Sequence, residues 1–212
     1  MFESLPGFIA SKGGQAILII IIVAFFVLIL IPKKEDRGKV DAKVLTVSAL
    51  LVAMGYVLGL FKLFSMPQGG AVTPLSMLPI ALCAYILGTR RGVMAGMVLG
   101  LLNLLIGGYV IHPVQMLLDY PLAFGAMGLG GIARKSNHGL LKAYLIGILG
   151  RYICAFISGV VFFGANAPEN FNAVTWSLWY NFTYIAAEGA ITVAVLCVPP
   201  VRRALEGLRD KF

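Results

Sequence analysis

Residues 140–165, LLKAYLIGILGRYICAFISGVVFFGA, form a continuous apolar run interrupted by only two charged side chains, Lys142 and Arg151. A helix needs about 20 mainly apolar residues to cross the hydrocarbon core of a bilayer, and this run is long enough. The run does not alternate apolar and polar residues, as the strands of an outer-membrane barrel do. It therefore predicts a membrane-spanning helix.

The rest of the chain has the same character. Of its 212 residues, 59% are hydrophobic and 12% are charged, and its mean hydropathy is +0.92. Soluble domains are about 45–50% apolar and about 25% charged, so the composition excludes a soluble or disordered chain. Five more apolar runs predict spans at 44–64, 74–88, 92–108, 113–133 and 177–199. With 140–165 they predict an all-α integral membrane protein built on a six-helix bundle.

A further apolar run, 16–31, precedes this bundle and is followed by Pro32 and the charged stretch 33–37. A signal peptide has its positive charge before the apolar region and a cleavage site after it, which is the reverse order. We therefore expect a retained, extra transmembrane helix. The predicted organisation is an extra helix and cytoplasmic linker at 1–43, a membrane domain at 44–199 and a basic, amphipathic cytoplasmic tail at 200–212.

The net charge of +8 is explained by its distribution along the chain. Fourteen of the 17 Lys and Arg residues fall in alternate connections, at 33–43, 90–91, 134–142 and 202–211. Positive residues mark the cytoplasmic side of membrane proteins. We therefore expect the C-terminus in the cytoplasm, and the N-terminus and the loops 65–73, 109–112 and 166–176 outside. The charge then indicates contact with the lipid bilayer and not with nucleic acid.

Three ionisable residues fall inside predicted spans, where charge is costly and is by default functional. Asp119 lies in the outer third of its span, two residues before Pro121, which removes a backbone donor and should distort the helix. This position suits a ligand that enters from outside, although a structural ion pair is an alternative. Arg151 and Glu188 lie near mid-depth, where they either neutralise each other or serve an ion pathway.

One face of the span at 140–165 combines polar, small and aromatic residues: Arg151, Tyr152, Ala155, Gly159 and Phe163. Small residues beneath an aromatic ring either leave space for a planar ligand or allow close helix packing. After the next loop come Trp176, which an aromatic belt explains, and Asn181, whose amide offers hydrogen-bond donors and an acceptor.

Small residues also mark where helices touch, because lipid gives no hydrophobic push for association. Ala49 and Ala53 lie one turn apart on one face and predict either a partner contact or internal packing. The ridge of Gly92, Gly96 and Gly100 is expected to be internal packing.

Several signatures of enzymes and metal sites are absent from the sequence. Gly38-Lys39 is followed by Val40, so there is no phosphate-binding loop. His112 and His138 fall in loops on opposite sides, and the cysteines lack metal-site spacing. We expect no metal, no cofactor and no catalytic activity.

Two motifs carry a resemblance to a known family. Residues 150–168, GRYICAFISGVVFFGANAP, together with Asn181, resemble the fifth span and following loop of thiamine-specific S-components of energy-coupling-factor (ECF) transporters. Leu118-Asp119-Tyr120-Pro121 is similar to the acidic-Tyr-Pro element of that family, and Arg90-Arg91-Gly92 and the Ala49/Ala53 pair also match. The resemblance covers about residues 44–199.

The resemblance implies a substrate-binding subunit of a vitamin importer in a prokaryotic plasma membrane. Its partners would be a transmembrane coupling protein and two ABC-type ATPases. Ala49 and Ala53 would face the coupling protein, and Asp119 and Asn181 would hold the aminopyrimidine of thiamine. The implied substrate-binding residues are Asp119, Tyr120, Arg151, Tyr152, Gly159, Phe163, Trp176 and Asn181.

The chemistry of thiamine agrees with these residue types. A carboxylate and an amide suit its aminopyrimidine, and aromatic faces attract its thiazolium cation by about 0.5–2 kcal/mol. Ala155, Phe163 and Trp176 depart from the family's His, Trp and Tyr, which leaves a related pyrimidine or thiazole as an alternative substrate. Two other classes stay open: a self-sufficient ion-coupled secondary transporter, and an intramembrane lipid transferase, which the lack of clustered acids or histidines disfavours.

Overall fold

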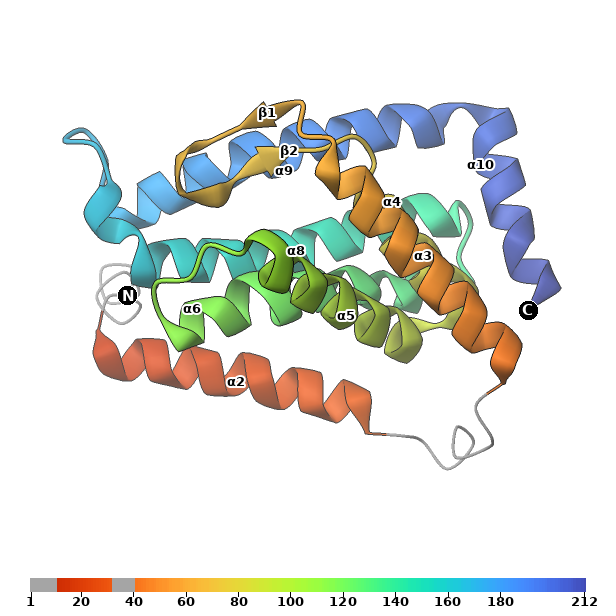
Figure 1. The fold of residues 1–212 in the computed structure, drawn as a ribbon, viewed down its shortest axis with the longest axis horizontal. Helices are drawn as coiled ribbons and strands as arrows, with labels where there is room; N and C mark the ends of the chain where they lie inside the picture. Colours follow the sequence, from red (N-terminus) through yellow and green to blue (C-terminus); the bar gives the residue numbers. More distant parts are fainter. Residues whose placement is uncertain (1–10, 32–40) are drawn as a thin grey trace.

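The computed structural model describes residues 11–31 and 41–212. Most of the linker predicted at 33–43 and most of the predicted outer N-terminus lie outside the described residues. The described part is mainly helical, and its helices lie side by side, with α2 along one edge and α9 along the opposite edge (Figure 1).

The elements follow one another along the chain with short connections. They are α2 (Lys12–Leu30), α3 (Ala42–Leu60), β1 (Phe64–Ser65), η2 (Pro67–Gly69), β2 (Ala71–Val72), α4 (Leu78–Leu87), α5 (Thr89–Gly107), α6 (Pro113–Leu117), η3 (Leu118–Leu122), α7 (Ala123–Ala126), η4 (Met127–Ala133), α8 (Gly139–Phe162), η5 (Gly164–Asn166), α9 (Ala173–Cys197), α10 (Pro199–Glu206) and η6 (Gly207–Lys211).

Five helical segments in the described residues are long and apolar enough to cross a membrane: α3, α5, the continuous segment Pro113–Ala133, α8 and α9. They coincide with five of the six predicted spans. The described apolar part of α2, Ile19–Leu30, is shorter, and so is α4. The protein is therefore a multi-pass membrane protein, as its composition predicts.

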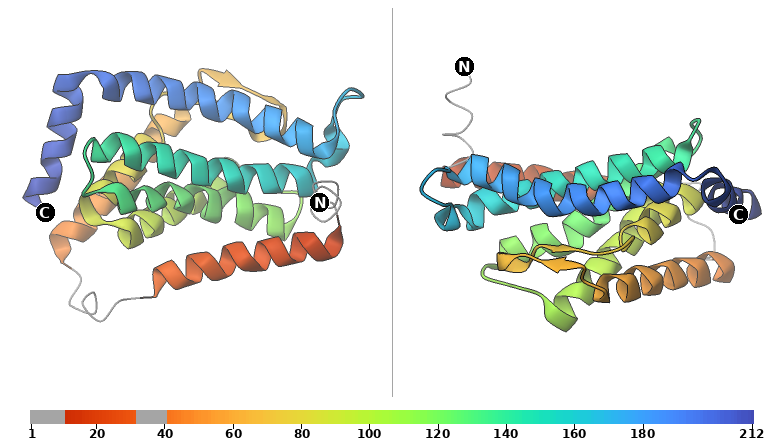
Figure 2. Two further views of the ribbon diagram at one scale, coloured as in Figure 1. Left: turned by 180° about the vertical axis from the view of Figure 1, so that it is seen from behind. Right: turned by 90° about the horizontal axis from the view of Figure 1, so that it is seen from above.

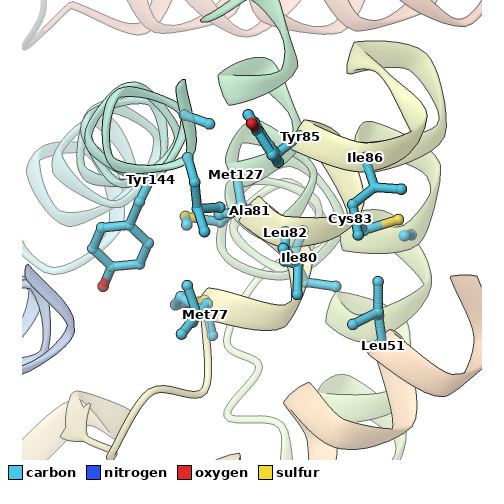
Figure 3. Close-up of a cluster of buried hydrophobic side chains, with 14 of the residues drawn as sticks. Leu51, Met77, Ile80, Ala81, Leu82, Cys83, Tyr85, Ile86, Met127 and Tyr144 are labelled. Atoms are coloured by element: carbon cyan, nitrogen blue, oxygen red, sulfur yellow. The ribbon is translucent and has the colours of Figure 1, made fainter. Parts of the chain in front are cut away.

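The span predicted at 74–88 differs most from the structure, because only ten of its residues, Leu78–Leu87, form α4. All ten are buried, and α4 packs against α3, α5, η4 and α8. Figure 3 shows part of this core, where Ala81 of α4 lies near Met127 of η4 in one buried cluster. The run is apolar because protein surrounds it, and a helix enclosed by protein need not match the thickness of the bilayer.

The glycine ridge of α5 is internal packing, as expected. A Cβ atom on Gly96 would lie 2.2 Å from the carbonyl oxygen of Phe124, and one on Gly100 would lie 2.3 Å from that of Tyr120. A Cβ on Gly92 would meet Ala84 of α4 at 2.4 Å. Glycine at these positions lets α5 approach α4, η3 and α7 closely.

The segment after Pro113 is distorted where Pro121 predicts a distortion. The α-helical turn α6 passes into the π-helical segment η3, which contains Pro121, and continues as α7 and the 3₁₀-helical η4. Proline lacks the N–H that an α-helix would use at this point. The irregular turn carries Asp119 and Tyr120.

The extra helix α2 is docked on the bundle against α5 (Figure 2). The ring of Phe26 is 3% exposed and packs in a cluster with Val93 and Ala126, whereas that of Phe25 is 48% exposed. Arg90 Nε donates a hydrogen bond to the carbonyl oxygen of Leu30 at 3.0 Å, which satisfies one of the free carbonyls at the end of α2.

Both ends of the bundle carry structure that the sequence predicts only in part. At one end, the predicted loop 65–73 forms most of an antiparallel hairpin, in which Ser65 pairs with Ala71. At the other end, the predicted amphipathic tail forms α10 and η6. Glu206 accepts a hydrogen bond from Leu140 N at 3.3 Å, and Arg209 donates one to the carbonyl oxygen of Arg134 at 2.6 Å. The tail is therefore tied to the start of α8 and the end of η4.

Candidate functional site

A cavity of about 200 Å³ lies between α3, α5, the α6–η3 segment, α8, α9 and the β1–β2 hairpin. Its size suits a small organic molecule. Seven of the eight predicted substrate-binding residues line it: Asp119, Tyr120, Arg151, Gly159, Phe163, Trp176 and Asn181. The fold thus brings residues up to 62 positions apart along the chain to one cavity.

Asp119 is the acidic residue of this cavity. Its Oδ2 accepts a hydrogen bond from Gln115 Nε2 at 2.6 Å, and the positive charge of Arg151 attracts the carboxylate. Gln115 is 1% exposed and was not among the predicted site residues. Its spacing of one helical turn before an intramembrane acid is the signal that could have identified it.

Tyr120 is bound to the loop that precedes its own helix. Its hydroxyl accepts from Tyr109 N at 2.5 Å and lies 3.3 Å from the Tyr109 carbonyl oxygen. The Tyr109 ring in turn packs on Phe163, with ring centroids 6.2 Å apart. Tyr109 therefore belongs to the cavity wall, although its position in a short loop carried no signal in the sequence.

Asn181 lies at the cavity, but most of its hydrogen-bonding capacity is used within the protein. Its Nδ2 donates to the carbonyl oxygens of Ser177 at 2.9 Å and Ala155 at 3.3 Å, and its Oδ1 accepts from the Tyr184 hydroxyl at 3.0 Å. The amide therefore joins α8 to α9, and what it retains for a ligand is acceptor capacity on Oδ1.

For Gly159, the sequence allows either space for a planar ligand or close helix packing, and the structure shows close packing. A Cβ atom there would lie 2.2 Å from Ser177 Oγ and 3.1 Å from Asn181 Nδ2. The space beside Gly159 is therefore filled by α9, and the glycine permits close packing of α8 on α9. Gly159 borders the cavity, but the volume that a side chain would take there is occupied.

Tyr152 is the predicted site residue that the structure does not place on the cavity. Its hydroxyl donates to the Leu178 carbonyl oxygen at 3.0 Å, on the outer part of α9. The reason is geometric, since Tyr152 follows Arg151 by one residue and is rotated by about 100° around the helix. The expectation that it shares the face of Arg151 was wrong.

Arg151 and Glu188 do not form an ion pair with each other in the described part of the chain. The Arg151 guanidinium lies over the Phe124 ring, 4.7 Å from its centroid. Glu188 is 3% exposed and accepts hydrogen bonds from Ser76 Oγ at 2.8 Å and Met77 N at 3.3 Å, at the start of α4. Of the two interpretations that the sequence leaves open, mutual neutralisation is therefore not observed, because the N-terminus of α4 is the partner of Glu188.

One wall of the cavity is aromatic. Trp176 packs on Tyr180 with ring centroids 5.7 Å apart, and Tyr180 packs on Tyr184 at 5.9 Å. The spacing of one helical turn between these residues is the signal that the sequence offered for the two tyrosines. The Tyr180 hydroxyl donates to the Pro67 carbonyl oxygen and accepts from Gly70 N at 3.1 Å, which holds the hairpin over the cavity.

The donor set of the cavity does not resemble a metal site. Within residues 11–31 and 41–212, no group of three or more His, Cys, Asp or Glu side chains is placed to hold a metal ion. What the cavity offers is a carboxylate, a guanidinium, hydroxyls and aromatic faces. The buried indole N–H of Trp176 has no partner in the described protein and is a further donor. This set can bind a small heteroaromatic molecule that carries donors of its own.

The fold and the cavity together define a class: multi-pass membrane proteins that hold a small molecule among their helices. The sequence matches the family "Thiamine transporter protein" over residues 45–205. This chain belongs to that family, which confirms the resemblance carried by residues 150–168 and 118–121. The helix α2 lies outside the matched region.

Named relatives agree with this assignment. The chain is 36% identical over 170 residues to "Thiamine transporter ThiT" of Bacillus subtilis, which covers 74% of this chain and 87% of the relative. It is 34% identical over 139 residues to the protein of the same name from Lacticaseibacillus paracasei, covering 58% and 69%. The solved structure of ThiT from Listeria monocytogenes superposes with a TM-score of 0.63 at 25% identity, covering 74% of this chain and 96% of that one.

Proposed function

We propose that this chain binds thiamine and is the substrate-binding subunit of an ECF-type vitamin importer. The proposal rests mainly on one observation: the Asp119 carboxylate accepts a hydrogen bond from Gln115 in a cavity that aromatic rings line. A carboxylate has about four acceptor sites, so the bond from Gln115 leaves capacity for the amine of an aminopyrimidine. The faces of Phe163, Trp176 and Tyr180 suit a thiazolium ring.

We also propose how the chain is arranged in the membrane. The six-helix domain would consist of α3, α4, α5, the Pro113–Ala133 segment, α8 and α9, with α2 as an extra seventh helix and domain boundaries near 43 and 199. The cavity and the hairpin would face outside. The end that carries the basic tail would face the cytoplasm, in agreement with the distribution of Lys and Arg.

We further propose that α3 carries the surface that contacts the coupling protein. Ala49 and Ala53 are both exposed on α3, and α2 packs on α5 instead. Two small residues on an exposed helix face let a second membrane helix approach closely. This supports a contact with the transmembrane coupling protein, through which two ABC-type ATPases would drive uptake.

Thiamine binding is tested by titrating the vitamin into the purified protein and following Trp fluorescence. We expect saturable quenching, because Trp176 lines the cavity, and weaker quenching by the separate pyrimidine and thiazole halves. Tighter binding of either half would favour a related substrate. Uptake by this chain alone in ATP-depleted vesicles with a proton gradient would favour an ion-coupled transporter.

A further inference from the structure

The side chain of Gln115 is buried, and both its amide nitrogen and its amide oxygen form hydrogen bonds. Nε2 donates to Asp119 Oδ2 at 2.6 Å and to the Tyr109 carbonyl oxygen at 3.0 Å. Oε1 accepts from Ile111 N at 3.1 Å. The carboxamide therefore joins the loop between α5 and α6 to the carboxylate of the cavity.

Only one orientation of this amide fits its surroundings. In the observed orientation, the two N–H groups meet Asp119 and the Tyr109 carbonyl, which are both acceptors. The reversed amide would turn its oxygen toward these two acceptors and its NH₂ toward the Ile111 N–H, so it would lose all three bonds. The direction of the bond from Gln115 to Asp119 is thus set by the loop.

The backbone changes its helix type between Gln115 and Asp119. Gln115 lies in α6, whereas Asp119 lies in the π-helical segment η3, so the pair spans a change of helix type. A π-helical turn is an irregular feature that occurs often at functional sites. Side-chain bonds across the junction restrict where the carboxylate points.

Tyr109 of the same loop also binds Tyr120, the neighbour of Asp119. The backbone N–H of Tyr109 donates to the Tyr120 hydroxyl at 2.5 Å, while its carbonyl accepts from Gln115. Both consecutive polar residues of η3 are therefore bound, directly or through Gln115, to the backbone of Tyr109. The loop and the acidic-Tyr-Pro element form one hydrogen-bonded unit.

We propose that Gln115 is a positioning residue for ligand recognition: it orients Asp119 so that the remaining acceptor sites of the carboxylate face the cavity. This inference rests on the proposed function, because its ligand is thiamine. A carboxylate that is already oriented loses little conformational freedom when the ligand binds, and this lowers the cost of binding. Gln115 itself need not touch the vitamin.

The first test compares two variants of the same loop region. Gln115→Met keeps the length of the side chain and removes all of its hydrogen bonds. We expect thiamine to bind about tenfold more weakly, as measured by calorimetry, because one hydrogen bond to a charged group is lost. His112→Ala is the matched control, since His112 caps α6 through Val114 N at 3.1 Å and stacks on Phe162. We expect it to lower the melting temperature and leave affinity unchanged.

The second test asks whether Gln115 acts through Asp119. If it does, the double variant Gln115→Met/Asp119→Asn binds thiamine no more weakly than Asp119→Asn alone. Independent, additive losses would overturn the inference, and so would unchanged affinity in Gln115→Met. If Gln115→Met does not fold, Gln115→Asn, which withdraws the amide by one methylene, should weaken binding in its place. Failure of the unaltered protein to bind thiamine would overturn the proposed function instead.

Discussion

The carboxylate of Glu188 on α9 accepts a hydrogen bond from the hydroxyl of Ser76 at 2.8 Å. The Ser76 hydroxyl also accepts from Thr73 Oγ1 at 2.7 Å, so a buried chain of polar groups ends on the acid. Met77 N donates to the same carboxylate oxygen at 3.3 Å. Glu188, for which the sequence allows a pairing with Arg151, instead anchors the start of α4, all of whose residues are buried.

Glu188 is therefore predicted to stabilise the protein without contacting the ligand. Glu188→Ala removes the acceptor of two buried donors and should lower the free energy of unfolding by about 1.5–3 kcal/mol, measured by thermal unfolding in detergent. Glu169→Ala, in an exposed loop, is the control and should be neutral. Loss of thiamine affinity in Glu188→Gln at unchanged stability would move the site to the membrane centre and favour ion coupling.

Asp119 is predicted to dominate ligand affinity. Asp119→Asn keeps the volume of the side chain but removes its charge and half of its acceptor capacity. We expect a loss of about 1.5–3 kcal/mol, or about ten- to hundredfold in Kd for thiamine. Asp210→Asn, in the exposed tail, serves as the control. Equal affinities of the two variants in a fluorescence titration would remove Asp119 from the site.

The two adjacent phenylalanines of α2 provide a matched test of its docking. Phe26 is 3% exposed and Phe25 is 48% exposed. Phe26→Ala should lower the melting temperature, whereas Phe25→Ala should have little effect. The loss should fall below the about 3–5 kcal/mol typical of soluble cores, because lipid also solvates an apolar ring. Equal melting temperatures would mean that α2 does not stabilise the bundle.

The exposed alanines of α3 are predicted to serve transport and not binding. Ala53→Trp places a bulky side chain on the proposed partner surface and should abolish thiamine uptake in cells that contain the coupling protein. Affinity of the purified variant should stay unchanged. Leu105→Trp, at a position of α5 that is 79% exposed, is the control and should leave uptake intact. Parallel loss of binding in Ala53→Trp would instead indicate an internal role.

The proposed topology is tested with single cysteines in a cysteine-free background. Asn170→Cys, in the loop before α9, should react with an impermeant maleimide added to intact cells. Asn137→Cys, in the loop before α8, should react only after the cells are opened. The reverse pattern would invert the whole assignment of sides.

The sequence alone determined the class of protein and predicted seven of the residues that line the candidate site. Long apolar runs specify membrane helices because the free energy of transferring a segment into lipid depends on its own residues. The motif around Asp119 and Tyr120, the distortion at Pro121 and the glycine ridge of α5 are likewise local features. For this reason each of them could be identified before any contact between helices was known.

The tertiary structure decided which groups bind one another. Nothing in the sequence joins Glu188 to Ser76, and nothing in it brings the Tyr109 backbone to Tyr120. The ten-residue length of α4 and the filled space beside Gly159 also depend on neighbouring helices. A buried polar group must find a hydrogen-bond partner, but any donor or acceptor can satisfy it. The partner is therefore chosen by how the helices pack, which a single sequence does not reveal.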